Sequence, residues 1–126
     1  MDHMKKDWGD ELQWIQKGIH QVDGYITTIS NHYLQHRLQN DEYEDRIFDE
    51  LDICWAIMNG RIVEGYDIGE RNGNKDPERI LIGPSLKEPW IVLAVVLRLD
   101  RHFIIKTVFP VDRERYQRYL ENDERP

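Results

Sequence analysis

The sequence has a single cysteine, no long apolar run and no excess of positive charge. Cys54 has no second cysteine with which to form an intrachain disulfide, so the fold depends on its core and its hydrogen bonds. The longest apolar run, Trp90 to Leu97, has eight residues, far too few to cross a bilayer. The first residues lead into charged ones rather than an apolar stretch. We therefore expect no signal peptide and a cytoplasmic location.

The net charge of −7 argues against a general nucleic-acid binder. The charge is unevenly distributed, however. Residues 41–52 contain seven acids and one base, whereas residues 79–118 contain eight bases and four acids. The basic half allows two interpretations: an ordinary surface of mixed charge, or a local site for a phosphate backbone within an acidic protein.

The first half of the sequence has a helical period. Residues 7–21 predict an amphipathic helix, residues 25–29 a short strand, and Ser30 or Asn31 the cap of a second helix. A third helix is predicted between an Asp49 N-cap and Gly60. Its expected buried stripe consists of Leu51, Cys54, Trp55 and Met58.

After Gly60 the period changes from that of a helix to that of a strand. We predict four strands, the third of which is apolar on both faces and therefore central, and then a short helix capped by Asp112. The strands are expected at residues 61–67, 79–83, 90–99 and 103–109. On the first of them, Ile62, Glu64 and Tyr66 should share a face, with Val63 on the other.

This order predicts an α+β fold, with an antiparallel sheet of four to five strands and helices packed on one face. The 126 residues suffice for one domain. We assign residues 1–24 to an N-terminal helical extension, residues 25–120 to a single α+β domain and residues 121–126 to a flexible tail.

Two histidines, His32 and His36, are four residues apart on the predicted second helix and therefore share a face. A metal site would need a third ligand, and the glutamate of an H-E-x-x-H motif is missing, so we expect neither a metal nor another cofactor. Arg37 follows directly. A histidine beside an arginine suits phosphodiester chemistry, in which imidazole transfers protons and guanidinium stabilises charge. The alternative is a solvated helix face with one histidine packed inward.

Glu64 and Tyr66 could meet basic residues of the neighbouring strands. Whether Arg98 and Lys106 share a face depends on the turn between their strands, because a slip of one residue inverts the answer. The alternative is a cross-strand salt bridge on the sheet surface. The candidate nucleic-acid-binding residues of this half are Arg79, Arg98 and Lys106. Cys54 is interpreted as a packing residue rather than a nucleophile.

The region from Ile26 to about Pro110 resembles the bacterial family catalogued as domain of unknown function 4258. Members have a short strand, a histidine that opens a helix, a second helix ending in glycine, an "I-x-E-x-Y" strand and three further strands. The matching runs are Ile29 to His32, Leu51 to Gly60, Arg61 to Asp67, Ile80 to Gly83, Trp90 to Val95 and Lys106 to Pro110. Four residues after that histidine, family members have an arginine. This sequence has His36 at that position, and Arg37 follows one residue later.

The family is similar in layout to the RelE-like toxins, which are small proteins that cleave mRNA, and some members are encoded beside zinc-ribbon antitoxins. The resemblance implies His32, Glu64 and Tyr66 as matching site positions, and an activity on RNA or at the ribosome. We hypothesise a toxin-like endoribonuclease of a toxin–antitoxin system, with His32, Arg37, Glu64 and Tyr66 as catalytic candidates. The alternative is a non-catalytic interaction module on the same fold, which binds a protein partner or forms a homodimer. Neither hypothesis involves a membrane.

Overall fold

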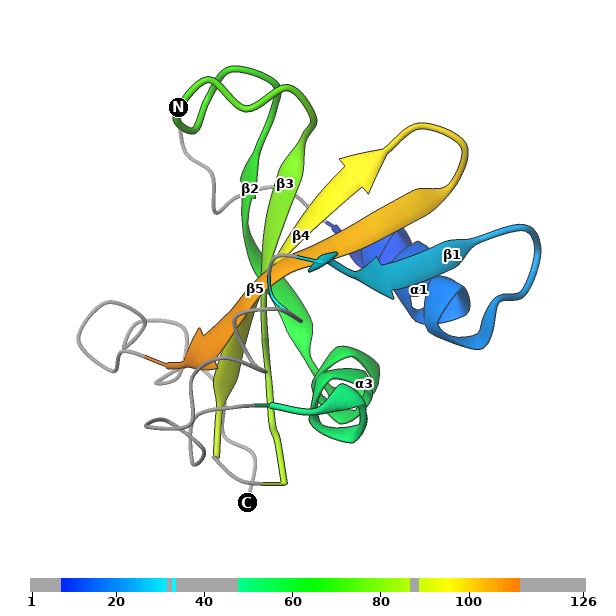
Figure 1. The fold of residues 1–126 in the computed structure, drawn as a ribbon, viewed down its shortest axis with the longest axis vertical. Coiled ribbons are helices and arrows are strands. Elements are labelled where there is room, and N and C mark those ends of the chain that lie inside the picture. Colours follow the sequence, from blue (N-terminus) through cyan, green and yellow to red (C-terminus); the bar gives the residue numbers. More distant parts are fainter. Residues whose placement is uncertain (1–7, 32, 34–47, 87–88, 112–126) are drawn as a thin grey trace.

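The computed structural model describes residues 8–31, 33, 48–86 and 89–111, and the structural statements below concern these residues. Two helices and five strands are present (Figure 1), in the order α1 (Gly9–His20), β1 (Ile26–Ile29), α3 (Glu50–Asn59), β2 (Arg61–Tyr66), β3 (Glu78–Gly83), β4 (Ile91–Arg98) and β5 (His102–Pro110). The predicted α+β class is confirmed. No helix in these ranges is long and apolar enough to cross a membrane.

The five strands form one sheet in the order β1-β5-β4-β3-β2, so the apolar strand β4 is central, as predicted. Strands β2 to β5 form an antiparallel meander, but β1 pairs with β5 in parallel. The expectation of a wholly antiparallel sheet is therefore wrong at this edge. The spacing of hairpins cannot predict this pairing, because β1 and β5 are far apart in the sequence: Ile26 lies opposite His102.

The two faces of the sheet carry separate apolar clusters. On the first face, α1 and α3 pack through Ile15, Ile53 and Ile57 against the inward residues of β3, β4 and β5. Figure 1 shows both helices on the same side of the meander. The second face carries a buried cluster of Val63, Ile80, Ile82, Val92 and Ala94. Because α1 contributes the fully buried Ile15, the predicted N-terminal extension takes part in the same core.

Helix α3 begins as predicted at Asp49, whose side chain accepts from Asp52 N in a reciprocal capping box. Its buried stripe was predicted wrongly. The expected stripe residues Leu51, Trp55 and Met58 are 70%, 51% and 40% exposed, and the buried residues are Asp52, Ile53, Ala56 and Ile57. Apolar side chains occur all around this helix, so periodicity alone could not identify the buried face. Asp52 can be buried because its carboxylate takes part in the capping box.

Strand β2 contains an irregularity between Ile62 and Glu64 that the sequence pattern did not predict. Ile62 packs on the helix-covered face, whereas Val63 and Tyr66 belong to the second face. The predicted faces of Ile62 and Val63 are therefore wrong. A bulge adds one residue to a strand and breaks its simple alternation. The same bulge leaves Glu64 and Tyr66 on one face, as expected.

Candidate functional site on the second sheet face

Four polar side chains cross the second face from β2 to β5, and we call them the polar row: Glu64, Tyr66, Glu78 and Lys106. The Tyr66 hydroxyl donates to Glu64 Oε1 at 2.8 Å. Tyr66 is also the cross-strand partner of Glu78. From β5, Lys106 reaches over β4 and places Nζ 3.4 Å from Glu78 Oε1. The row therefore brings together three residues proposed from the sequence and adds Glu78, which the sequence analysis missed.

The two carboxylates of the row are buried, and its cation is exposed. Glu64 is 5% and Glu78 3% exposed, whereas the Lys106 side chain is 58% exposed. A carboxylate at such a position needs hydrogen bonds or a counter-charge, since burying an unpaired ion is costly. Tyr66 and Lys106 meet that need for Glu64 and Glu78, respectively. A ligand arriving from solvent would consequently meet the lysine before the carboxylates.

Arg98 lies on the same face as Lys106, which settles the point that the sequence left open. Its strand places Val92 and Ala94 in the second-face cluster, and strict alternation puts Arg98 there as well. Its cross-strand partner is His102, so the turn comprises the three residues 99–101. Arg98 is exposed.

His102, which was not proposed from the sequence, joins Arg98 at this end of the second face. Its Nε2 lies 3.1 Å from the hydroxyl of Thr28 on the neighbouring edge strand. The face therefore carries imidazole and guanidinium side by side in the sheet, two residues along β4 from the register position of Glu78. A single histidine at the start of a strand forms no recognisable sequence motif. The pairing with Arg98 therefore becomes visible only from the strand register.

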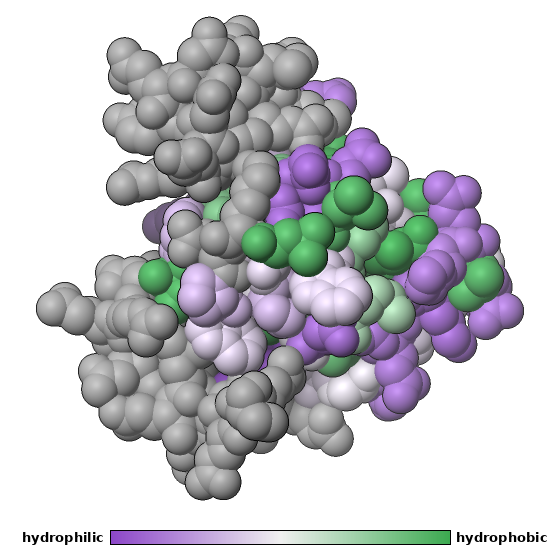
Figure 2. All heavy atoms as spheres, turned by 90° about the horizontal axis from the view of Figure 1, so that it is seen from below, coloured by the Kyte–Doolittle hydropathy of each residue, from purple (hydrophilic) through white to green (hydrophobic). Residues whose placement is uncertain are grey.

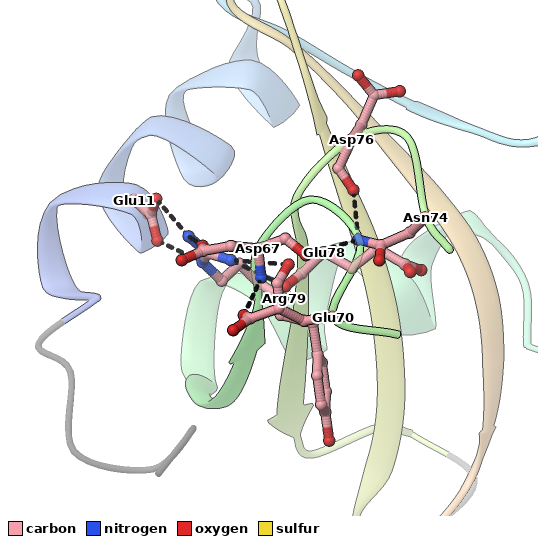
Figure 3. Close-up of polar contacts among 8 residues, drawn as sticks. Glu11, Asp67, Glu70, Asn74, Asp76, Glu78 and Arg79 are labelled. Carbon is pink, nitrogen blue, oxygen red and sulfur yellow. Dashed lines mark hydrogen bonds and ion pairs between the residues drawn. The ribbon is translucent and has the colours of Figure 1, made fainter. Parts of the chain in front are cut away.

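Arg79 lies on the other face and is 6% exposed. Figure 3 shows Glu11 of α1 and Asp67 facing its guanidinium. Glu11 accepts two hydrogen bonds, at 2.7 Å from Nε and 3.2 Å from Nη2, and Asp67 lies 3.4 Å from Nη2. The backbone carbonyls of Tyr66 and Glu78 accept from Nη1. This arginine, a candidate nucleic-acid-binding residue, therefore joins α1 to the sheet and takes no part in the polar row.

His32, His36 and Arg37 lie outside the described residues. The chain immediately before His32 is placed, because the Ser30 hydroxyl donates to the carbonyl of Lys106 at 3.1 Å. The same hydroxyl accepts from Tyr33 N at 3.1 Å. An N-cap was predicted at Ser30 or Asn31, and this hydrogen bond is the N-cap pattern at Ser30, beside β5.

Arg71, in the loop between β2 and β3, was also missed. Its guanidinium carbon lies 5.1 Å from the centre of the Tyr66 ring, within the range of a cation–π contact. The loop is ordered by Asn74, which accepts from Arg71 N and donates to the carbonyls of Asp67 and Asp76. Figure 3 shows Asn74 facing Asp76. Nothing in the sequence of this polar loop indicates that the Arg71 side chain packs back onto Tyr66 of β2.

Cys54 lies on α3 and is partly exposed. Burial, and to a smaller extent the negative charge of Glu50, raises the pKa of the Cys54 thiol. A raised pKa lowers the thiolate fraction, which disfavours nucleophilic chemistry at this residue. A cavity of about 260 Å³ adjoins it, lined also by Ile19, Ile53 and Ile105. Within the described ranges, no group of three or more potential ligands could hold a metal ion.

Comparisons of the chain with protein-family models, with curated proteins and with solved structures found no match. The functional assignment therefore depends on the residues of the site and on the resemblance noted from the sequence.

Proposed function

We propose that the chain is a toxin-like endoribonuclease that cleaves mRNA, free or on the ribosome, in the cytoplasm. The observation that best supports this proposal is the Glu64–Tyr66 hydrogen bond of 2.8 Å on the sheet face that also carries Lys106. Both members of the pair are positions implied by the resemblance. An antitoxin protein is the corresponding partner in the cell.

The reaction that suits these groups is transfer of the phosphodiester to the neighbouring 2′-hydroxyl. The 2′-oxygen attacks phosphorus while its proton passes to the Glu64 carboxylate, which Tyr66 orients. Lys106 stabilises the negative charge that develops on the phosphoryl oxygens. The bond from phosphorus to the 5′-oxygen breaks, and that oxygen takes a proton from water. The products are a 2′,3′-cyclic phosphate and a free 5′-hydroxyl.

The test is cleavage of a 5′-labelled mRNA by the purified protein, with and without ribosomes. Glu64→Gln removes the proposed base, and Tyr66→Phe removes the hydroxyl that orients it. Each has a matched control, Glu50→Gln on α3 and Tyr25→Phe beside α1. We expect site-specific cuts that the first two variants lose and the controls keep. RNA left intact by the wild type under both conditions would refute the proposal.

The same assay tests the two catalytic candidates that lie outside the described residues. The double variant His32→Ala/Arg37→Ala should lose the cuts if these side chains take part in the reaction. Unchanged cleavage by this variant would restrict the proposed site to the polar row.

A second function, that of a non-catalytic interaction module, has its own structural support. Leu51, Trp55 and Met58 recur on one side of α3 and remain 70%, 51% and 40% exposed. Residues with this spacing share a helix face. Figure 2 views the molecule from below, the side on which α3 lies in Figure 1, and shows apolar side chains exposed among polar ones. An exposed apolar helix face is typical of a protein-binding surface.

Self-association through this face is tested by sedimentation over a range of concentrations. Leu51→Glu places a charge on the α3 face, and Leu99→Glu, in the β4–β5 turn, is the control at a leucine that is 86% exposed. We expect a concentration-dependent dimer that only the first variant abolishes. A wild type that stays monomeric throughout would contradict self-association.

A further inference from the structure

The guanidinium of Arg71 has an unsatisfied donor in a buried position. Its Nη1 has no hydrogen-bond partner although the atom is shielded from solvent. An unpaired buried donor is rare in proteins because its desolvation is not repaid. Such a group requires an acceptor from outside the chain, either a water molecule or a ligand. Apart from Arg71, only Trp8 Nε1 has this status among the described side chains.

Arg101 offers a comparison within the same molecule. It too is stacked on a tyrosine, with its guanidinium carbon 5.2 Å from the centre of the Tyr25 ring. Its Nη1, however, donates to the carbonyl of Asp23 at 2.7 Å. The two arginines thus share the cation–π contact and differ in hydrogen bonding. Nη1 of Arg101 has a hydrogen-bond acceptor within the chain, whereas the buried Nη1 of Arg71 has none.

The position of Arg71 identifies the acceptor that suits it. Its guanidinium lies over Tyr66, whose hydroxyl donates to Glu64 and whose cross-strand neighbour, Glu78, is paired with Lys106. Two cations therefore approach the polar row, one from the β2–β3 loop and one from β5. Guanidinium binds phosphate with parallel hydrogen bonds and stacks on aromatic rings, so it is well suited to this place.

We propose that Arg71 is a phosphate-binding residue that contacts a phosphodiester of RNA at the polar row. The proposal rests on the proposed function and deepens it by assigning the group that receives the phosphate. Arg71 is only partly buried as a residue, so its guanidinium can donate to a phosphoryl oxygen, and the Tyr66 ring holds the guanidinium flat for this contact. Lys106 contributes a second charge from the opposite side of the row.

The test measures binding of a fluorescent RNA 12-mer with 2′-deoxy positions, which cannot be cleaved by attack of the 2′-oxygen, at several salt concentrations. Arg71→Gln should weaken binding roughly ten- to a hundredfold, as expected for the loss of a hydrogen bond to a charged group. It should also reduce the slope of log affinity against log salt by about 0.7, the value for one phosphate contact on a single strand. Arg71→Lys should keep the slope and recover only part of the affinity.

Arg101→Gln is the matched control and should leave affinity and slope unchanged. Thermal unfolding supplies a further readout. Arg71→Gln should lower stability less than Arg101→Gln, because both variants lose a cation–π contact and only Arg101→Gln also loses a hydrogen bond. Equal binding by Arg71→Gln and wild type would overturn the proposal, as would a loss of stability that accounts for the weaker binding.

The outcomes for Arg71 and for the proposed function are distinguishable. RNA cleavage by the wild type, together with unchanged binding and cleavage by Arg71→Gln, would refute the role of Arg71 and leave the endoribonuclease standing. Arg71-dependent binding without any cleavage would support the phosphate site and refute the nuclease. A wild type that does not bind the 12-mer would overturn the assignment of Arg71 to RNA.

Discussion

Glu11→Gln is expected to reveal how strongly the fold depends on the guanidinium of Arg79. The substitution keeps the shape of the side chain and removes its charge. Arg79 is then left in its buried position, 7% exposed at the side chain, with the more distant Asp67 as its only carboxylate among the described residues. A buried cation that loses its main counter-charge is strongly destabilising.

The magnitude follows from the contacts that are lost and kept. Arg79 makes two hydrogen bonds to Glu11, at 2.7 and 3.2 Å. In Glu11→Gln one of them is lost because the amide NH₂ cannot accept, and the other loses its charge assistance. Breaking a buried ion pair by removing one partner costs about 3–5 kcal/mol. Asp67 and two backbone carbonyls remain around Arg79. We therefore expect a loss of about 3 kcal/mol in the free energy of unfolding, at the lower end of that range.

The assay is urea unfolding followed by circular dichroism, with Asp23→Asn as control. The Lys17–Asp23 pair has a similar distance, 3.3 Å, but its side chains are 44% and 66% exposed. Exposed pairs contribute at most about 1 kcal/mol. Both variants should keep the wild-type dependence on urea, since the surface exposed on unfolding is the same. Equal losses in the two variants would refute the reasoning.

Three further substitutions test the local accounts. Asp52→Ala removes the carboxylate that accepts from Asp49 N in the capping box and from Leu86 N, and should cost roughly 2 kcal/mol in urea unfolding; a cost below a few tenths would contradict the role of this buried carboxylate. Gly65→Ala places a methyl group 2.7 Å from the Trp8 ring and should cost about 1–3 kcal/mol, accompanied by a change in tryptophan fluorescence. Because the pKa of Cys54 is raised, iodoacetamide should react with it more slowly near neutral pH than with a free cysteine, and Glu50→Gln should accelerate the reaction. An equal rate in that variant would rule out an electrostatic contribution from Glu50.

The sequence predicted the meander well because each hairpin is local. Alternating residues set the strands, and a long apolar run identified β4 as the centre. The parallel pairing of β1 with β5 was not predicted, because it depends on the contact between Ile26 and His102, which no residue near β1 in the sequence specifies. The buried side of α3 escaped for a different reason. Both possible faces are apolar, and the choice was made by tertiary packing of Ile53 and Ile57.

The candidate site could be predicted only where two residues share a strand. Glu64 and Tyr66 alternate, so their common face followed from the period of two. Glu78 and Arg71 could not be predicted, because a cross-strand partner and a loop that folds back depend on register and on turn geometry. Arg79 illustrates the reverse case. Its charge suggested a role at the surface, but the chain uses it to bind Glu11 in the interior.

The most direct test of the central proposal is an analysis of the RNA ends after incubation with the purified protein. The account predicts fragments that end in a 2′,3′-cyclic phosphate and begin with a 5′-hydroxyl, formed by the wild type and by Glu50→Gln but not by Glu64→Gln. Intact RNA, or fragments that persist in Glu64→Gln, would contradict a nuclease site at the polar row.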